Sequence, residues 1–226
     1  MSTDTPPSST SASPAVPAPM LTELEARILG SLIEKAATTP DAYPLTLNNI
    51  QLACNQKTSR EPVMQLETGE IGHALRTLEP RGLVKSEYGA RAERYQHRLD
   101  RVLDLTPGQT AVLALLMLRG AQTVGELLTR SERLHRFADT NDLRHALERL
   151  AERETPLVRM VGRAHGQRED RYAHLLCGEP AMPEAGVSTA RSAASDAIDP
   201  DTLQTLLERI DALEARVAAL EAAGAG

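Results

Sequence analysis

Three short sequence blocks recur in the same order along the chain, and this repetition restricts the possible folds more than any other feature. LTELEARILGSLIEK, which begins at Leu21, aligns with LTPGQTAVLALLMLR, which begins at Leu105. HALRTL from His73 recurs as HALERL from His145, and RYQHRL recurs as RYAHLL. Because the order is kept while the spacing between blocks changes, the sequence predicts two tandem copies of one small fold.

Each copy has the pattern of three helices followed by two strands. Thr22 with Glu25, and Thr106 with Gln109, are capping-box pairs that would begin the first helix of each copy. The third helices show apolar residues at helical spacing, and a Leu-Val pair then leads into an extended hairpin. Three helices followed by a hairpin is the winged-helix arrangement, a variant of helix-turn-helix. We therefore expect an α+β fold, mostly helical, with tandem winged-helix domains followed by a C-terminal coiled-coil helix.

The ends of the chain differ from its middle in composition. The first 19 residues are mostly Ser, Thr, Pro and Ala, which cannot bury enough apolar surface to offset the entropy of ordering. The expected organisation is a disordered tail at 1–19, a winged-helix domain at 20–102, a second at 103–177, a linker at 178–199 and a coiled-coil helix at 200–222.

The C-terminal segment carries a heptad pattern with β-branched or leucine residues at one core position and leucine at the other. These residues are Leu203, Leu206, Ile210, Leu213, Val217 and Leu220. Such a pattern favours a parallel homodimer, and opposite charges fall at the flanking positions. The alternative is that the helix docks on its own domain.

The charge of the chain is unevenly distributed. The net charge is −6, but the two ends hold 3 basic and 10 acidic residues, so residues 21–177 are nearly neutral. This removes an objection to nucleic-acid binding without arguing for it. Two distant cysteines indicate no disulfide framework, and the N-terminus lacks the features of a signal peptide. With no apolar run long enough to span a bilayer, we expect a cytoplasmic protein that does not enter the membrane.

The stretch ACNQKTSREP lies where a helix-turn-helix has its turn. Five of its side chains could donate to phosphate oxygens or base edges, namely Asn55, Gln56, Lys57, Ser59 and Arg60. One alternative is a solvated turn held by local side-chain bonds. Another is catalysis by Cys54, but no base is specified nearby, and the histidines in matched positions of the repeat read as fold determinants. No catalytic residue is therefore predicted.

Further candidate DNA contacts lie on the third helix and on the hairpin of the first copy. They are His73, Arg76, Arg91, Arg94 and Arg98. Gly72 is expected on the exposed face of the same helix, where either a ligand approaches the backbone closely or, as we favour slightly, a glycine is simply tolerated. The hairpin arginines could instead only make an edge strand more soluble. In the second copy the equivalent helix mixes Arg144 and Arg149 with Glu148, which makes it the weaker candidate for DNA binding.

The sequence gives little indication of a metal site or of other reactive groups. His174 and Cys177 have H-x-x-C spacing, but no second pair accompanies them, so no metal and no cofactor are expected. Glu34 and Lys35 are read as a solvated charge pair at the end of a helix.

The segment LTELEARILGSLIEKAATTPDAYPLTLNNIQLACNQKTSREPVM closely resembles the start of the YceH family, bacterial proteins without an assigned activity. The later blocks LMLRGAQTVGELLTRSERLHRF and REDRYAHLL also resemble that family's pattern. The resemblance implies a tandem winged-helix fold and, by analogy of fold, DNA binding as a regulator. It supplies no catalytic residue or cofactor.

The expected function is therefore duplex DNA binding of a transcription-regulator type, through the helix-turn-helix and wing of the first domain, with no enzyme activity. The alternative is a winged-helix module that binds protein and does not contact DNA.

Overall fold

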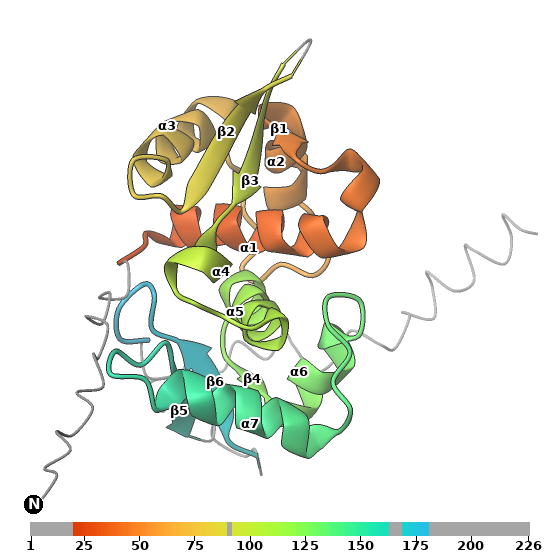
Figure 1. Cartoon of the computed structure of the whole chain (residues 1–226), viewed down its shortest axis with the longest axis vertical. Coiled ribbons are helices and arrows are strands. Elements are labelled where there is room, and N and C mark those ends of the chain that lie inside the picture. The colour runs from red at the N-terminus through yellow and green to blue at the C-terminus, as the bar shows by residue number, and fades with distance from the viewer. Residues whose placement is uncertain (1–19, 90–91, 163–168, 181–226) are drawn as a thin grey trace, which may run out of the picture. The chain divides into compact units, whose positions relative to one another are not determined.

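The chain folds into two halves with the same order of elements (Figure 1). The computed structural model describes residues 20–89, 92–162 and 169–180. These residues all belong to one compact unit. The predicted tail, most of the predicted linker and the heptads at 200–222 lie outside the described residues.

Each half runs helix, strand, helix, helix, strand, strand. The first half comprises α1 (Glu23–Thr38), the 3-10 turn η1 (Pro40–Ala42), β1 (Leu45–Thr46), α2 (Leu47–Cys54), α3 (Thr68–Leu78), β2 (Val84–Tyr88), β3 (Glu93–His97) and the short helix α4 (Leu99–Val102). The second comprises α5 (Pro107–Arg119), β4 (Gln122–Thr123), α6 (Val124–Ser131), α7 (Thr140–Ala151), β5 (Val158–Gly162) and β6 (Arg171–His174).

The strands form two small antiparallel sheets, in the orders β1-β3-β2 and β4-β6-β5. Val84 pairs with His97 in the first sheet, and Val158 pairs with His174 in the second. A mixed fold with helices and hairpins is thus confirmed. The two-residue strands β1 and β4 were not predicted, because a strand that short has no alternation to recognise.

The capping boxes predicted from the sequence are formed. The Thr22 backbone N–H donates to Glu25 Oε2 at 2.9 Å, and the Glu25 N–H donates to Thr22 Oγ1 at 3.2 Å. Thr106 and Gln109 make the same exchange at 3.0 and 3.3 Å. Side-chain capping satisfies backbone groups that a helix start leaves without partners, so the first helix of each half begins where the sequence indicates.

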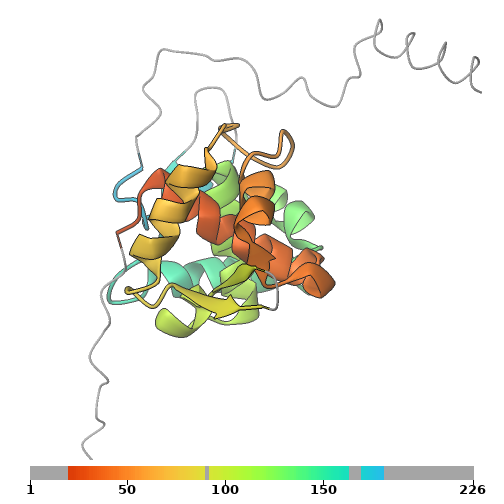
Figure 2. The same ribbon diagram turned by 90° about the horizontal axis from the view of Figure 1, so that it is seen from above.

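The two halves share one hydrophobic core, in which α1 packs against α5. Seen from above, α1 is flanked by α2 and α3 (Figure 2). A Cβ atom on Gly30 would lie 2.9 Å from Leu118 Cγ, so the two helices approach too closely for a side chain there. The Leu21 N–H donates to Leu176 O at 2.7 Å, and the equivalent Leu105 N–H donates to Asp100 O at 2.8 Å. The start of each half is therefore hydrogen-bonded to the segment that follows the last strand of the other half.

Candidate nucleic-acid interface

The loop between α2 and α3 is closed at its base by Asn55. The Asn55 Nδ2 amide donates to Leu66 O at 2.9 Å, and Asn55 Oδ1 accepts from the Leu66 N–H at 2.8 Å. Both ends of the amide are thus used within the loop. This agrees with the locally bonded turn that the sequence left as an alternative, rather than with a free donor.

Arg60 lies in the interior, which corrects its prediction as a DNA contact. The residue is only 5% exposed. Its Nε donates to Ala53 O at 3.0 Å, and its Nη1 donates to Ser59 O at 2.8 Å. The same Nη1 lies 2.6 Å from Glu34 Oε2. A guanidinium held by a carboxylate and two carbonyls inside the fold is not available to phosphate.

The same ion pair corrects the prediction for Glu34. The Glu34 side chain is 15% exposed and that of Lys35 is 19% exposed, and Lys35 Nζ lies 3.6 Å from Glu34 Oε1. Glu34 is therefore a mostly buried counterion of Arg60 rather than half of a solvated pair.

Ser59 belongs to the contact between the two halves. Its Oγ accepts from Arg119 Nη2 at 2.6 Å, and the neighbouring Glu61 N–H donates to Leu118 O at 2.8 Å. The loop thus attaches the first half to the end of α5. Of the five side chains predicted from this loop, Gln56 is half-buried and Lys57 is exposed.

A second buried arginine, Arg27, was not recognised in the sequence. It is 1% exposed and donates to Cys54 O at 3.3 Å and to Pro62 O at 2.6 Å. Burial lowers its pKa, and the nearby Arg60 lowers it further. The one available signal was its position inside the apolar run that predicts the first helix.

Cys54 is fully buried beneath the same loop. Its Sγ lies 3.6 Å from Ser31 Oγ, and burial raises the pKa of the thiol. A reactive cysteine needs an accessible setting that favours the thiolate, so Cys54 has the character of a small core residue.

The outer face of α3 carries His73 and Arg76, both exposed as expected. Gly72 is buried, which corrects its predicted exposure. The Arg76 Nη1 atom lies 3.6 Å from the position of a Cβ on Gly72, so the arginine side chain folds back over this glycine. At the start of the helix, the Glu67 N–H donates to Glu70 Oε2 at 2.8 Å. Exposed carboxylates therefore stand at the N-terminal end of this face.

The hairpin of the first half carries two of its three predicted arginines in the described residues. Arg94 is exposed and donates from Nη1 to Pro44 O at 2.8 Å. Arg98 lies just past β3, where its backbone begins α4, so the strand is shorter than predicted. Arg91 lies outside the described residues. Glu87 accepts from Lys85 Nζ at 2.7 Å, and this bond lowers the pKa of its carboxyl.

The matched histidines His97 and His174 are the last residues of β3 and β6, the central strands of the two sheets. The His97 backbone N–H donates to the Tyr43 hydroxyl at 2.7 Å. Burial lowers the pKa of both imidazoles, that of His174 to about 4. Among the described residues, neither Nδ1 atom has a hydrogen-bond partner. Burial thus favours the neutral imidazole at both positions, and at His97 the Asp100 carboxylate, with Oδ1 3.6 Å from Nδ1, acts in the opposite direction.

The exposed face of α7 is mixed in sign, with Arg144, His145, Glu148 and Arg149. His145 Nδ1 lies 3.5 Å from Glu148 Oε2.

Within the described ranges, no three His, Cys, Asp or Glu side chains gather as metal ligands would. Over the same ranges, no helix is both long and apolar enough to cross a membrane.

Comparison with known proteins assigns the chain to a family. The family described as "Protein of unknown function, DUF480" matches residues 21–185. A UPF0502 protein of Stenotrophomonas maltophilia strain K279a is 56% identical over 206 residues, which cover 90% of this chain and 92% of the relative. A UPF0502 protein of Xanthomonas campestris pv. campestris strain B100 is 54% identical over 220 residues, covering 93% and 98%. The predicted membership of an uncharacterised bacterial family is confirmed: the chain belongs to the DUF480, or UPF0502, family.

Proposed function

We propose that this protein is a tandem winged-helix protein that binds duplex DNA as a transcription regulator. The observation that supports this most directly is the repeated helix–strand–helix–helix–strand–strand order, with a hairpin after the third helix of each half. In helix-turn-helix proteins the corresponding helix enters the major groove and neighbouring segments contact the backbone.

The proposed contact surface lies on the first half. His73 and Arg76 on α3 would meet the groove, and Arg94 and Arg98 beside the hairpin would meet phosphates. Lys57 extends this set from the exposed part of the loop. Arg60 and Asn55 hold the loop in shape and do not belong to the surface.

The test is fluorescence anisotropy of the full-length protein on random duplex DNA over a range of salt concentrations. The logarithm of affinity should fall linearly with the logarithm of salt, with a slope of about −0.9 for each phosphate neutralised. Arg94→Gln and Arg98→Gln should each make that slope shallower by about 1, because each removes one phosphate contact, and Arg76→Gln should lower the affinity by removing a groove contact.

Arg136→Gln is the matched control, since Arg136 is an exposed arginine of the second half outside the proposed surface. It changes the net charge equally and should leave the slope unchanged. An equal effect of all four substitutions would show only a loss of overall charge, and the proposed surface would be rejected.

A second candidate function, binding of a protein partner, is favoured by the carboxylates at the third helices. Glu67 and Glu70 lie at the start of α3, and Asp139 and Asp142 lie at the start of α7. The N-terminal residues of a recognition helix are the ones that reach base edges, and carboxylates there repel phosphates. Binding to DNA is strongest at low salt, so the absence of any DNA binding at about 50 mM salt would favour the protein-partner function.

We also propose that the heptads at 200–222 join two chains. Removal of residues 200–226 should convert a dimer into a monomer, because Leu203, Ile210 and Val217 with their intervening leucines would form the seam. Light scattering of the full-length chain, 24.5 kDa as a monomer, and of the truncated chain measures this directly. A truncated protein that stays dimeric would place the interface elsewhere.

A further inference from the structure

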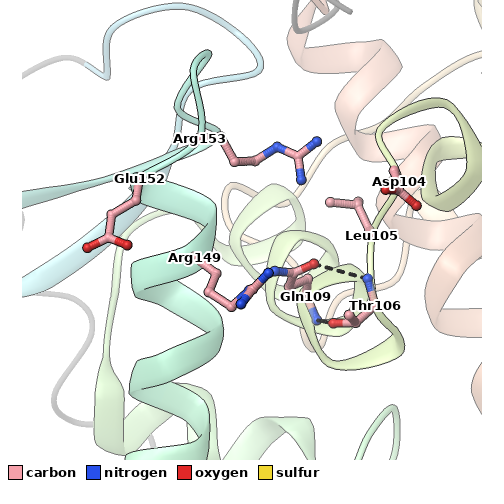
Figure 3. A pocket seen from close by; sticks show the side chains of 7 residues that line it. All are labelled: Asp104, Leu105, Thr106, Gln109, Arg149, Glu152 and Arg153. Atoms are coloured by element: carbon pink, nitrogen blue, oxygen red, sulfur yellow. Dashed lines mark hydrogen bonds between the residues drawn. The ribbon is translucent and has the colours of Figure 1, made fainter. Parts of the chain in front are cut away.

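A cavity of about 540 Å³ lies where the end of α7 meets the start of α5 (Figure 3). Its volume is within the range of small-molecule sites in proteins. It is lined from the start of α5 and the residues before it by Asp104, Thr106 and Gln109, and from the end of α7 and the residues after it by Arg149, Glu152 and Arg153. None of these residues belongs to the surface proposed above for DNA.

Gln109 is held so that its amide nitrogen faces this cavity. The residue is only 5% exposed. Its Oε1 accepts from the Thr106 N–H at 3.0 Å in the capping box, and this bond fixes the orientation of the amide. No described residue accepts a hydrogen bond from Nε2, which Figure 3 shows turned toward Arg149. Nε2 is not one of the fully buried polar atoms without a partner, so it is open to the cavity and can donate to a ligand there.

Two guanidinium groups add to this donor. Arg153 is positioned by the bond from its Nη2 to Leu103 O at 2.6 Å. Arg149 has no hydrogen bond or ion pair with any residue that the structure describes. Figure 3 shows both side chains reaching toward the start of α5, whereas Glu152 extends away from them. The N-terminus of this 13-residue helix contributes a further partial positive charge.

We propose that this cavity binds the phosphate group of a small phosphorylated metabolite. Guanidinium groups pair with phosphate oxygens through parallel hydrogen bonds, and two of them match the double negative charge of a phosphate monoester. Arg149 and Arg153 hold the phosphate, and Gln109 Nε2 donates to one of its oxygens. Because the cavity joins α7 to α5, the metabolite links the third helix of the second half to the core.

The experiment is an NMR titration of the full-length protein with inorganic phosphate and with phenyl phosphate at constant ionic strength. The readout is the resonance of the Gln109 side-chain amide, which should shift and saturate. Arg149→Gln should weaken binding by about tenfold or more, because a hydrogen bond to a charged group is lost. Arg144→Gln, an exposed arginine of α7 that does not line this cavity, should change affinity by less than about twofold.

A second variant separates binding from folding. Gln109→Glu keeps the capping acceptor, since Glu25 and Glu126 occupy the same place in the capping boxes of α1 and α6. It replaces the amide donor with a carboxylate that repels phosphate, so binding should be lost while the thermal midpoint is kept. Retention of full affinity in this variant would overturn the proposal.

Duplex DNA added to the same titration distinguishes the two sources of a phosphate group. The proposal requires that DNA does not displace phenyl phosphate and that Arg149→Gln leaves any DNA affinity unchanged. Competition by DNA would assign the cavity to the DNA backbone and overturn the assignment to a metabolite. The phosphate titration itself contains no DNA, so its result is independent of the DNA-binding proposal.

Discussion

Replacing Glu34 with alanine is expected to lower the free energy of unfolding by about 3–5 kcal/mol, the range measured when one partner of a buried ion pair is removed. Arg60 has a fully buried side chain, and Glu34 Oε2 lies 2.6 Å from its Nη1. Without the carboxylate, a guanidinium would remain inside the fold with only carbonyl partners. Urea unfolding at pH 7, with the midpoint and slope compared between wild type and variant, measures the change.

Two further variants make this prediction specific. Glu154→Ala removes an exposed carboxylate and should change stability by no more than about 0.5 kcal/mol. The double variant Glu34→Leu with Arg60→Met should recover part of the loss, because no buried charge then remains. If Glu34→Ala were as stable as Glu154→Ala, the pair would have no role in holding the loop to the core.

Acidification is expected to destabilise the protein through His174. Burial lowers the pKa of this imidazole to about 4, whereas the unfolded chain has the ordinary value of about 6.5. Between these two values the unfolded state binds a proton that the folded state does not bind. Stability is therefore complete above pH 6.5 and falls as the pH drops toward 4, by about 3 kcal/mol in total. His97, whose pKa is also lowered by burial, adds a loss of the same sign.

The measurement is a series of urea unfolding curves between pH 4 and pH 7. His174→Asn removes the titrating group and should flatten the dependence of stability on pH. His145→Gln provides the control, because it removes a histidine whose side chain is 79% exposed instead of buried. An unchanged slope in His174→Asn would mean that the acid sensitivity arises at other groups.

Local signals were sufficient for much of the fold. The capping pairs predicted the starts of α1 and α5, since a cap involves residues three positions apart in the chain. The apolar spacing of α3 predicted which side chains point outward, and His73 and Arg76 are exposed accordingly. Gly72 was misplaced, because a glycine has no side chain whose polarity indicates its side of the helix.

The candidate contacts in the loop were predicted less well, for a physical reason. Arg60 and Ser59 have side chains that suit phosphate, but the same donors suit any acceptor that the fold brings near. Arg60 pairs with Glu34 of α1 and donates to the carbonyl of Ala53 in α2, whereas the Ser59 hydroxyl accepts from Arg119 of α5, at sequence separations that no local pattern reports. Residue type alone therefore could not separate surface donors from buried ones.

The sequence by itself determined the repeated order of helices and strands, because caps, periodicity and matched blocks act over short stretches of chain. The tertiary structure alone decided how the halves join: α1 meets α5 at Gly30, and the loop carrying Arg60 attaches to that core. It also decided that Gln109 and Arg149 face one cavity from opposite helices. Packing between distant segments sets burial, and burial decides whether a charged side chain holds the fold together or remains available to a ligand.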